Sequence, residues 1–170
     1  SANLTWFKSP QTNVKFGLQY KKLGFQYLNS FQDSLQFEIK TMPLEFAQYV
    51  KIKYSPNSTF ILEPGMRINY YDVYSEKIFP DLRFGSKYLL TEDRYINFSI
   101  GNYHQFICTF QDDFNPSILD QWIAVDTSVE PGKSIQYVLG YEEYIRSIYK
   151  LQIEGYYKNI QNLLTFEEKR

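Results

Sequence analysis

The sequence contains only one cysteine, Cys108, and only one histidine, His104, among its 170 residues. A single cysteine excludes an internal disulfide framework and a cysteine-rich metal site. A single histidine excludes the usual histidine-based zinc sites. No stretch approaches the about 18 consecutive apolar residues that a membrane-spanning helix needs. The sequence therefore predicts neither a metal centre nor a helical membrane anchor.

The chain also has no large excess of either charge, because it contains 18 basic and 19 acidic residues. No run of Lys or Arg compensates locally, so we expect no nucleic-acid partner. His104 falls near the end of an expected strand beside a long loop, where we expect a rim residue rather than a base or ligand. No basic residues cluster beside Cys108, which indicates an inert thiol. We predict no enzyme activity, no catalytic residue and no cofactor.

Aromatic residues are abundant, with 16 Tyr and 14 Phe. Tyrosine is favoured where one end of the side chain is in apolar surroundings and the other is wet, as at a membrane interface. The stretch IYKLQIEGYYK at 148–158 places its aromatic and apolar residues in one phase of a period-two pattern. These residues are Tyr149, Leu151, Ile153 and Tyr157, opposite Lys150, Gln152, Glu154 and Lys158. This alternation indicates a strand with two different faces, and we expect the first set to face lipid and the second a lumen.

The same alternation recurs along the chain and predicts an all-β fold, an antiparallel up-and-down meander of about eight long strands. The expected strands cover residues 3–7, 13–28, 44–54, 59–74, 80–90, 94–107, 134–145 and 148–164. Soluble strands are typically about 5–6 residues long, whereas about 9–11 tilted residues span a bilayer. The strand lengths therefore favour part of a transmembrane β-barrel.

Two strands carry irregularities in this pattern. The apolar phase flips near Lys21 and Lys22, which indicates either a bulge or a strand that leaves the apolar layer. Pro64 and Gly65 interrupt the strand expected over 59–74. Because the apolar phase continues across this dipeptide, we predict a bulge there rather than a hairpin turn.

The connections differ in length at the two ends of the expected strands. Short turns are expected over residues 8–12, 55–58, 91–93 and 146–147, and the connections between them cover 29–43, 75–79 and 109–133. Short turns at one end and longer loops at the other are typical of an outer-membrane barrel. We therefore expect 29–43 and 109–133 at the extracellular end.

Five of the eight glycines fall on the polar face within strands, namely Gly17, Gly65, Gly85, Gly101 and Gly140. A solvent-facing strand gains nothing from glycine, which weakens it. A concave lumen that another backbone approaches would use such positions. A soluble β-sandwich or meander produces the same alternation, so this alternative stays open.

The stretch PLEFAQYVKIKYSPNSTFILEPGMRINYYDVYSEKIFPDLRFGSKYLL, followed by INFSIGNYHQF, resembles the barrel region of TonB-dependent outer-membrane receptors of the Bacteroidetes type. The P-x-x-x-A-x-Y-like strand of that family resembles Pro43 through Tyr49. Its G-x-R-x-x-Y strand resembles Gly65, Arg67 and Tyr70. The segments VEPGKSIQYVLGYE and YKLQIEGYYKNIQNLL resemble a following hairpin. The match covers most of the chain from about residue 43.

Two further strands complete the order that the resemblance follows. A proline-led strand would run from Pro80 to Tyr88, and a Y-G-x-x-x-Q-like strand resembles Gly101 through Gln105, with Ile100 in place of the tyrosine. The sequence shows no plug domain, no energy-coupling box and no terminal strand that ends in an aromatic residue. Since barrels of such transporters have about 22 strands, we expect residues 1–170 to be an internal part of one barrel domain.

The resemblance implies a receptor of the bacterial outer membrane that imports an extracellular ligand. Its implied partners are membrane lipid, the plug domain of the same full-length chain and the TonB complex, which supplies energy. The candidate ligand-binding residues are Asp112, Asp113, Trp122 and Asp126 in an outer loop, and Arg67 and Asn69 in the lumen. The alternatives are a small structural or adhesive outer-membrane barrel and a soluble all-β binding module.

Overall fold

The computed structural model describes residues 1–31, 34–110, 121–124, 130–146 and 148–162, with the backbone alone for 27–31, 34–39, 108–110 and 121–124. These residues form twelve strands and no helix. The strands are β1 (Ala2–Ser9), β2 (Thr12–Lys22), β3 (Phe25–Phe31), β4 (Ser34–Thr41), β5 (Leu44–Tyr54), β6 (Phe60–Tyr71), β7 (Ile78–Thr91), β8 (Arg94–Gln105), β9 (Ile107–Phe110), β10 (Gln121–Ala124), β11 (Gly132–Ile145) and β12 (Tyr149–Gln161).

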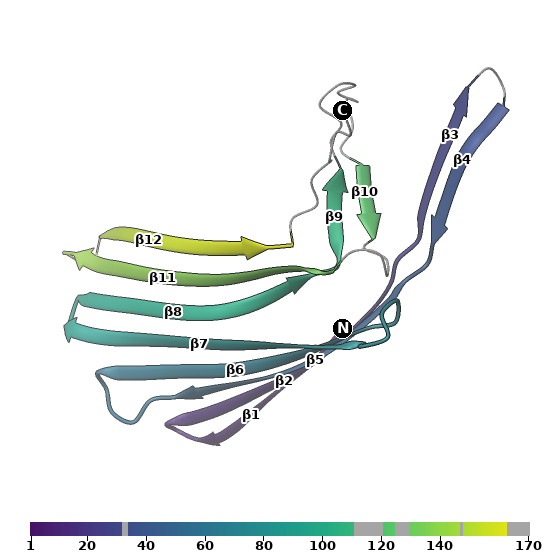
Figure 1. Cartoon of the computed structure of the whole chain (residues 1–170). Coiled ribbons are helices and arrows are strands. Elements are labelled where there is room, and N and C mark those ends of the chain that lie inside the picture. Colours follow the sequence, from purple (N-terminus) through teal and green to yellow (C-terminus); the bar gives the residue numbers. More distant parts are fainter. Residues whose placement is uncertain (32–33, 111–120, 125–129, 147, 163–170) are drawn as a thin grey trace.

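Eight of these strands form one antiparallel sheet in the order β1-β2-β5-β6-β7-β8-β11-β12. The order follows the chain, apart from two inserted hairpins, so the predicted meander of about eight antiparallel strands is confirmed (Figure 1). Within the described residues no pairing joins β1 to β12. The sheet is therefore open and has two free edges.

The connections expected over 29–43 and 109–133 are not simple loops. The first belongs largely to the hairpin β3–β4, and the second contains β10, which pairs with β9. The hairpin β3–β4 extends β2 and β5 beyond the sheet, and the Leu23 N–H donates to the Pro43 carbonyl at 3.0 Å at the junction. The phase flip near Lys21 and Lys22 thus marks a strand that leaves the sheet.

Both hairpins rise from the same end of the sheet (Figure 1). The short connections β1–β2, β5–β6, β7–β8 and β11–β12 lie at the opposite end. The predicted difference between the two ends is confirmed. The sequence pattern did not predict the hairpins. Their strands lie outside the main sheet, so their apolar residues do not alternate in the phase of that sheet.

The bulge predicted at Pro64 and Gly65 is wrong. Strand β6 runs through both residues, and the pairs Lys51↔Gly65 and Tyr54↔Leu62 keep one register with β5. Pairing is absent only between these two pairs, because proline has no N–H to donate to the ladder. The apolar phase therefore continues across the dipeptide without an inserted residue.

The two faces of the sheet differ in polarity and in exposure. Large apolar side chains that share one face are exposed to solvent: Leu4, Trp6, Phe16, Leu18, Tyr20, Ile52, Tyr54, Met66, Ile78, Leu82, Phe84, Tyr88, Ile96, Phe98, Tyr137, Leu139, Tyr149, Leu151, Ile153 and Tyr157. Their phase includes the residues that the sequence assigned to lipid. We call this surface the apolar face.

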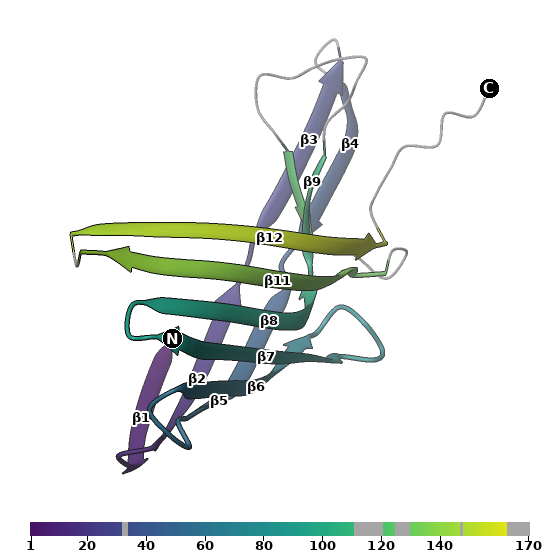
Figure 2. The ribbon, with the colours of Figure 1, turned by 90° about the vertical axis from the view of Figure 1, so that its left-hand side faces the viewer.

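The opposite face, which we call the polar face, carries the buried polar side chains Glu45, Asn69, Asp81 and Glu142. Side chains crowd together on the inside of a curved sheet, so burial identifies the polar face as the concave one. The right-handed twist accumulates across the strands. It turns β1 and β2 steeply away from β11 and β12 (Figure 2).

The accessible surface of the chain is 13019 Å². A compact monomer of this mass exposes only roughly 8,800 Å². The buried apolar cluster in the described residues is small and consists of Tyr71 and Phe106, packed against Val73, Tyr74 and Phe79 near the hairpin end. No described element covers the apolar face.

Candidate functional site

A network of polar side chains crosses the concave face, and Arg67 on β6 is at its centre. Its Nε donates to Asn69 Oδ1 at 2.6 Å, and its Nη2 donates to Gln19 Oε1 at 2.7 Å. The same Nη2 lies 3.5 Å from a carboxylate oxygen of Glu45, which also pairs with Lys21 at 3.1 Å. Gln19 is on β2, so Arg67 reaches across β5, which the curvature of the sheet permits.

Asp81 on β7 extends this network toward β8. Asn69 donates to Asp81 Oδ2 at 2.9 Å and to the Phe79 carbonyl at 3.2 Å. The Nδ1 of His104 lies 2.7 Å from Asp81 Oδ1. The His104 side chain is only 12% exposed, although the residue lies next to the end of its strand as expected. Residue 104 lies inside the polar network because the pairing of β8 with β7 ends at Gly101.

The side chain of Asn102 explains how His104 reaches Asp81. The ladder between β7 and β8 runs only to the pair Arg83↔Gly101. Beyond it, Asn102 Oδ1 accepts a hydrogen bond from the Leu82 N–H at 2.6 Å, and Asn102 Nδ2 donates to the Pro80 carbonyl at 3.0 Å. The side-chain amide thus takes the place of a backbone rung while β8 stays paired with β11.

A second group of ion pairs lies on the concave face nearer the short turns. Glu142 on β11 lies 3.3 Å from the Nζ of Lys87 on β7 and 3.4 Å from that of Lys150 on β12. The Lys87 ammonium also sits 4.0 Å from the ring centroid of Tyr95. Charges of both signs therefore line this face over most of the sheet, which requires contact with water or a polar ligand.

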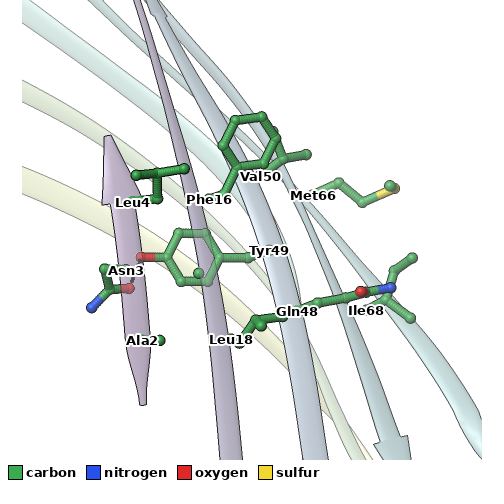
Figure 3. A pocket seen from close by; sticks show the side chains of 11 residues that line it. Ala2, Asn3, Leu4, Phe16, Leu18, Gln48, Tyr49, Val50, Met66 and Ile68 are labelled. Carbon is green, nitrogen blue, oxygen red and sulfur yellow. Dashed lines mark hydrogen bonds between the residues drawn. The ribbon is translucent and has the colours of Figure 1, made fainter. Parts of the chain in front are cut away.

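The apolar face has a groove of about 470 Å³ across β1, β2, β5 and β6 (Figure 3). Leu4, Phe16, Val50 and Met66 form one row beside it, and Ala2, Leu18, Gln48 and Ile68 form the next. Gln48 is the polar exception and extends toward Ile68. On the other side of the sheet, Tyr49 lies across Gly17 and donates to Asn3 Oδ1 at 2.7 Å.

The predicted lumen residues Arg67 and Asn69 do lie together on the concave face, in direct contact. Asp112, Asp113 and Asp126 lie outside the described residues. Trp122 on β10 and Cys108 on β9 are described by their backbone alone. The sequence indicated no role in the site for Gln19, Glu45, Asp81 or His104. The first three occur in the polar phase of their strands, and strand register would have joined them to Arg67.

Among the described residues, no group of His, Cys, Asp and Glu side chains is arranged to hold a metal ion. A search of the same part of the chain found no helix long and apolar enough to cross a membrane.

Comparison of the chain with protein-family models, curated proteins and solved structures gives no match. The functional assignment therefore rests on the architecture of the sheet and on the chemistry of its two faces.

Proposed function

We propose that the chain forms part of the wall of a transmembrane β-barrel in a bacterial outer membrane. The observation that carries this proposal is the pairing of an exposed apolar face with a charged concave face on the same long strands. Strands β2, β5, β6, β7, β8, β11 and β12 have 11 to 14 residues. That length suffices for the about 9–11 tilted residues that cross a bilayer.

The free energy of apolar burial supports lipid contact at the apolar face. Burying one Leu, Ile or Phe side chain contributes about 1.5–3 kcal/mol. More than twenty large apolar side chains are exposed among the described residues. If they stayed in water, the chain would lose tens of kcal/mol of burial free energy. That loss exceeds the about 5–15 kcal/mol by which a typical domain is stable. A soluble sandwich would need a second layer over this face.

The charged residues are distributed as a bilayer requires. A Lys or Arg on the lipid face costs about 2–4 kcal/mol at the bilayer midplane and little near the interfaces. Arg94 and Glu143 form a 3.0 Å ion pair on the apolar side, but they lie beside the turn at 92–93 and thus at the margin of the apolar band. The other ion pairs lie on the concave face, where a lumen provides water.

The free edges support membership of a larger barrel. Strand β12 has 13 exposed residues and β1 has 8, and each pairs along one side only. Long unpaired edges promote aggregation, and closure into a barrel removes them. We infer that further strands pair with both edges. In a receptor of the TonB-dependent type the eight strands would supply about a third of the about 22 strands.

On this proposal the barrel imports an extracellular ligand, and a plug domain and the TonB complex complete the transporter. The hairpins β3–β4 and β9–β10 would face the outside, because longer loops are extracellular in such barrels. Labelling of intact cells with a membrane-impermeant reagent tests this orientation. Labels should reach residues 34–41 and spare residues 55–58, and the opposite result would reverse the orientation.

The dependence of folding on a membrane mimic tests the proposal itself. We expect the chain to stay soluble and rich in strand only with detergent micelles or lipid vesicles, as judged by circular dichroism and gel filtration. A monodisperse, cooperatively unfolding monomer in plain buffer would support the soluble binding module instead.

A further inference from the structure

A hollow of about 330 Å³ opens on the concave face between β5 and β8. Its polar lining includes Tyr49, Lys51, Glu63, Arg67, Arg83 and Tyr103, around Gly65 and Gly85. Gly85 keeps the hollow deep, because a Cβ there would find no atom nearer than the Glu63 Cβ at 3.7 Å. The hollow is therefore a space between long polar side chains, with charges at its walls.

The positive charges around the hollow differ in how well they are compensated. Lys51 pairs with Glu63 at 2.9 Å. Arg67 shares the Glu45 carboxylate with Lys21. It also donates hydrogen bonds to the side-chain amide oxygens of Asn69 and Gln19. Arg83 has only Asp81 at 3.9 Å, which is beyond hydrogen-bond distance, and Asp81 is already engaged by Asn69 and His104. One guanidinium is thus left without a hydrogen bond among the described residues.

This guanidinium lies over an aromatic ring. Arg83 lies over Tyr103, with 4.5 Å between its Cζ and the ring centroid, and its side chain remains 45% exposed. A guanidinium held over a ring has an edge that can donate two parallel hydrogen bonds to a planar carboxylate. The stacking therefore prepares Arg83 for a carboxylate at low cost in side-chain entropy.

We propose that this hollow binds a singly charged carboxylate through the edge of Arg83. One guanidinium, whose nearest carboxylate is 3.9 Å away, matches a monoanion better than a doubly charged phosphate. The carboxylate belongs either to a small solute or to an Asp or Glu side chain of a polypeptide segment that rests on the concave face. The inference goes beyond the proposed function and does not depend on it, since it requires only that water reaches the concave face.

The test is a ligand-observed NMR titration of the complete protein, in micelles or in whichever medium keeps it folded. The probes are propionate, an aspartate capped at both ends, and propionamide as the neutral control. We expect both carboxylates to bind saturably and propionamide not to bind. Arg83→Gln should weaken the binding about tenfold or more, because a charge-assisted hydrogen bond is lost.

Two further variants separate loss of the site from loss of the fold. Gly85→Val should fill the hollow and weaken carboxylate binding to a similar extent while every charge stays in place. Arg94→Gln is the matched control, because Arg94 lies on the neighbouring strand, on the apolar side, and pairs with Glu143. It should leave carboxylate binding unchanged. Circular dichroism should show the same strand content for all three variants.

The relative affinities identify the source of the carboxylate. Tighter binding of the capped aspartate than of propionate assigns the site to a polypeptide segment, and equal binding assigns it to a solute. The proposal is overturned if neither carboxylate binds, if Arg83→Gln binds them equally well, or if inorganic phosphate binds more tightly than propionate. None of these results bears on lipid contact at the apolar face, so the two proposals fail separately.

Discussion

Tyr49 and Gly17 show how single side chains set the pairing of the strands. Asn3, Gly17 and Tyr49 are direct register partners on β1, β2 and β5. The missing side chain of Gly17 lets the Tyr49 ring lie flat across β2, and its hydroxyl then reaches Asn3 at 2.7 Å. A shift of one residue in any of the three strands would break this contact, because it would turn the side chains to the other face.

We therefore expect Gly17→Ala to destabilise the sheet by about 1–3 kcal/mol, as overpacking typically does. The added Cβ would collide with the Tyr49 ring and lie 2.7 Å from Asn3 Oδ1. The free energy of unfolding, from urea titration in lipid vesicles, measures the effect. Gly155→Ala on β12 is the control, because no atom lies within 4 Å of its added Cβ. Equal effects of the two substitutions would contradict this account.

The polar phase of the strands was sufficient to place Arg67 and Asn69 on the concave face. It did not predict that His104 joins them, because the even positions of β8 belong to the apolar phase up to Ile100. The change depends on the Asn102 side chain, which bonds to the backbone of β7. Such a contact depends on three-dimensional proximity and leaves no periodic signal in the sequence.

Strand β8 illustrates how one element serves two parts of the fold. It pairs with β11 from Arg94 to Gln105 and with β7 only as far as Gly101. The divergence from β7 leads the chain into β9 and brings Phe106 against Tyr71, with ring centroids 4.6 Å apart. The Asn102 side chain therefore joins β7 to β8 beyond the end of their ladder, where the sheet meets the hairpins. We call this junction the seam.

Replacing Asn102 with Ala should open this seam locally. The Leu82 N–H and the Pro80 carbonyl would lose their partners, at a cost of about 1 kcal/mol for a typical hydrogen bond. Amide hydrogen exchange is the measurement, and it should become faster at Leu82. It should stay unchanged at Leu89, whose N–H donates to the Thr59 carbonyl at 2.8 Å. Unchanged exchange at Leu82 would show that Asn102 does not hold the seam.

The strand boundaries in the main sheet were largely predictable because each strand alternates between two unlike surroundings. Strand β5 has the expected bounds of 44–54. The hairpins β3–β4 and β9–β10 escaped prediction because a projecting ribbon does not have the same two surroundings. Pro64 was misread for a different reason, since a missing donor interrupts the ladder without changing the register.

The molecule as a whole is a curved sheet whose apolar surface points outward and whose charges point inward. This is the reverse of a soluble domain, in which apolar side chains fill the interior. Its surface of 13019 Å² exceeds the roughly 8,800 Å² of a compact monomer. Lipid on one face and further strands at both edges would account for this excess surface.

Depth within the bilayer should determine the cost of a charge on the apolar face. Leu139 is in the middle of β11 and 60% exposed, so Leu139→Arg should cost about 2–4 kcal/mol. Leu151 pairs with Glu143 at the margin of the apolar band, so Leu151→Arg should cost only about 0–1 kcal/mol. Unfolding in vesicles measures both. A similar cost at the two positions would argue against a membrane of defined depth.

The central claim is that lipid covers the apolar face, and a fluorophore on strand β11 tests it. Cys108 is replaced by Ser in the complete protein, and a single cysteine is introduced for labelling at Leu139 on the apolar face or at Gln136 on the polar face. We predict that brominated lipids quench the label at position 139 and that aqueous iodide quenches the label at 136. Protection of position 139 from both quenchers would mean a protein core, and quenching there by iodide alone would mean a wet surface. Either result would contradict the barrel.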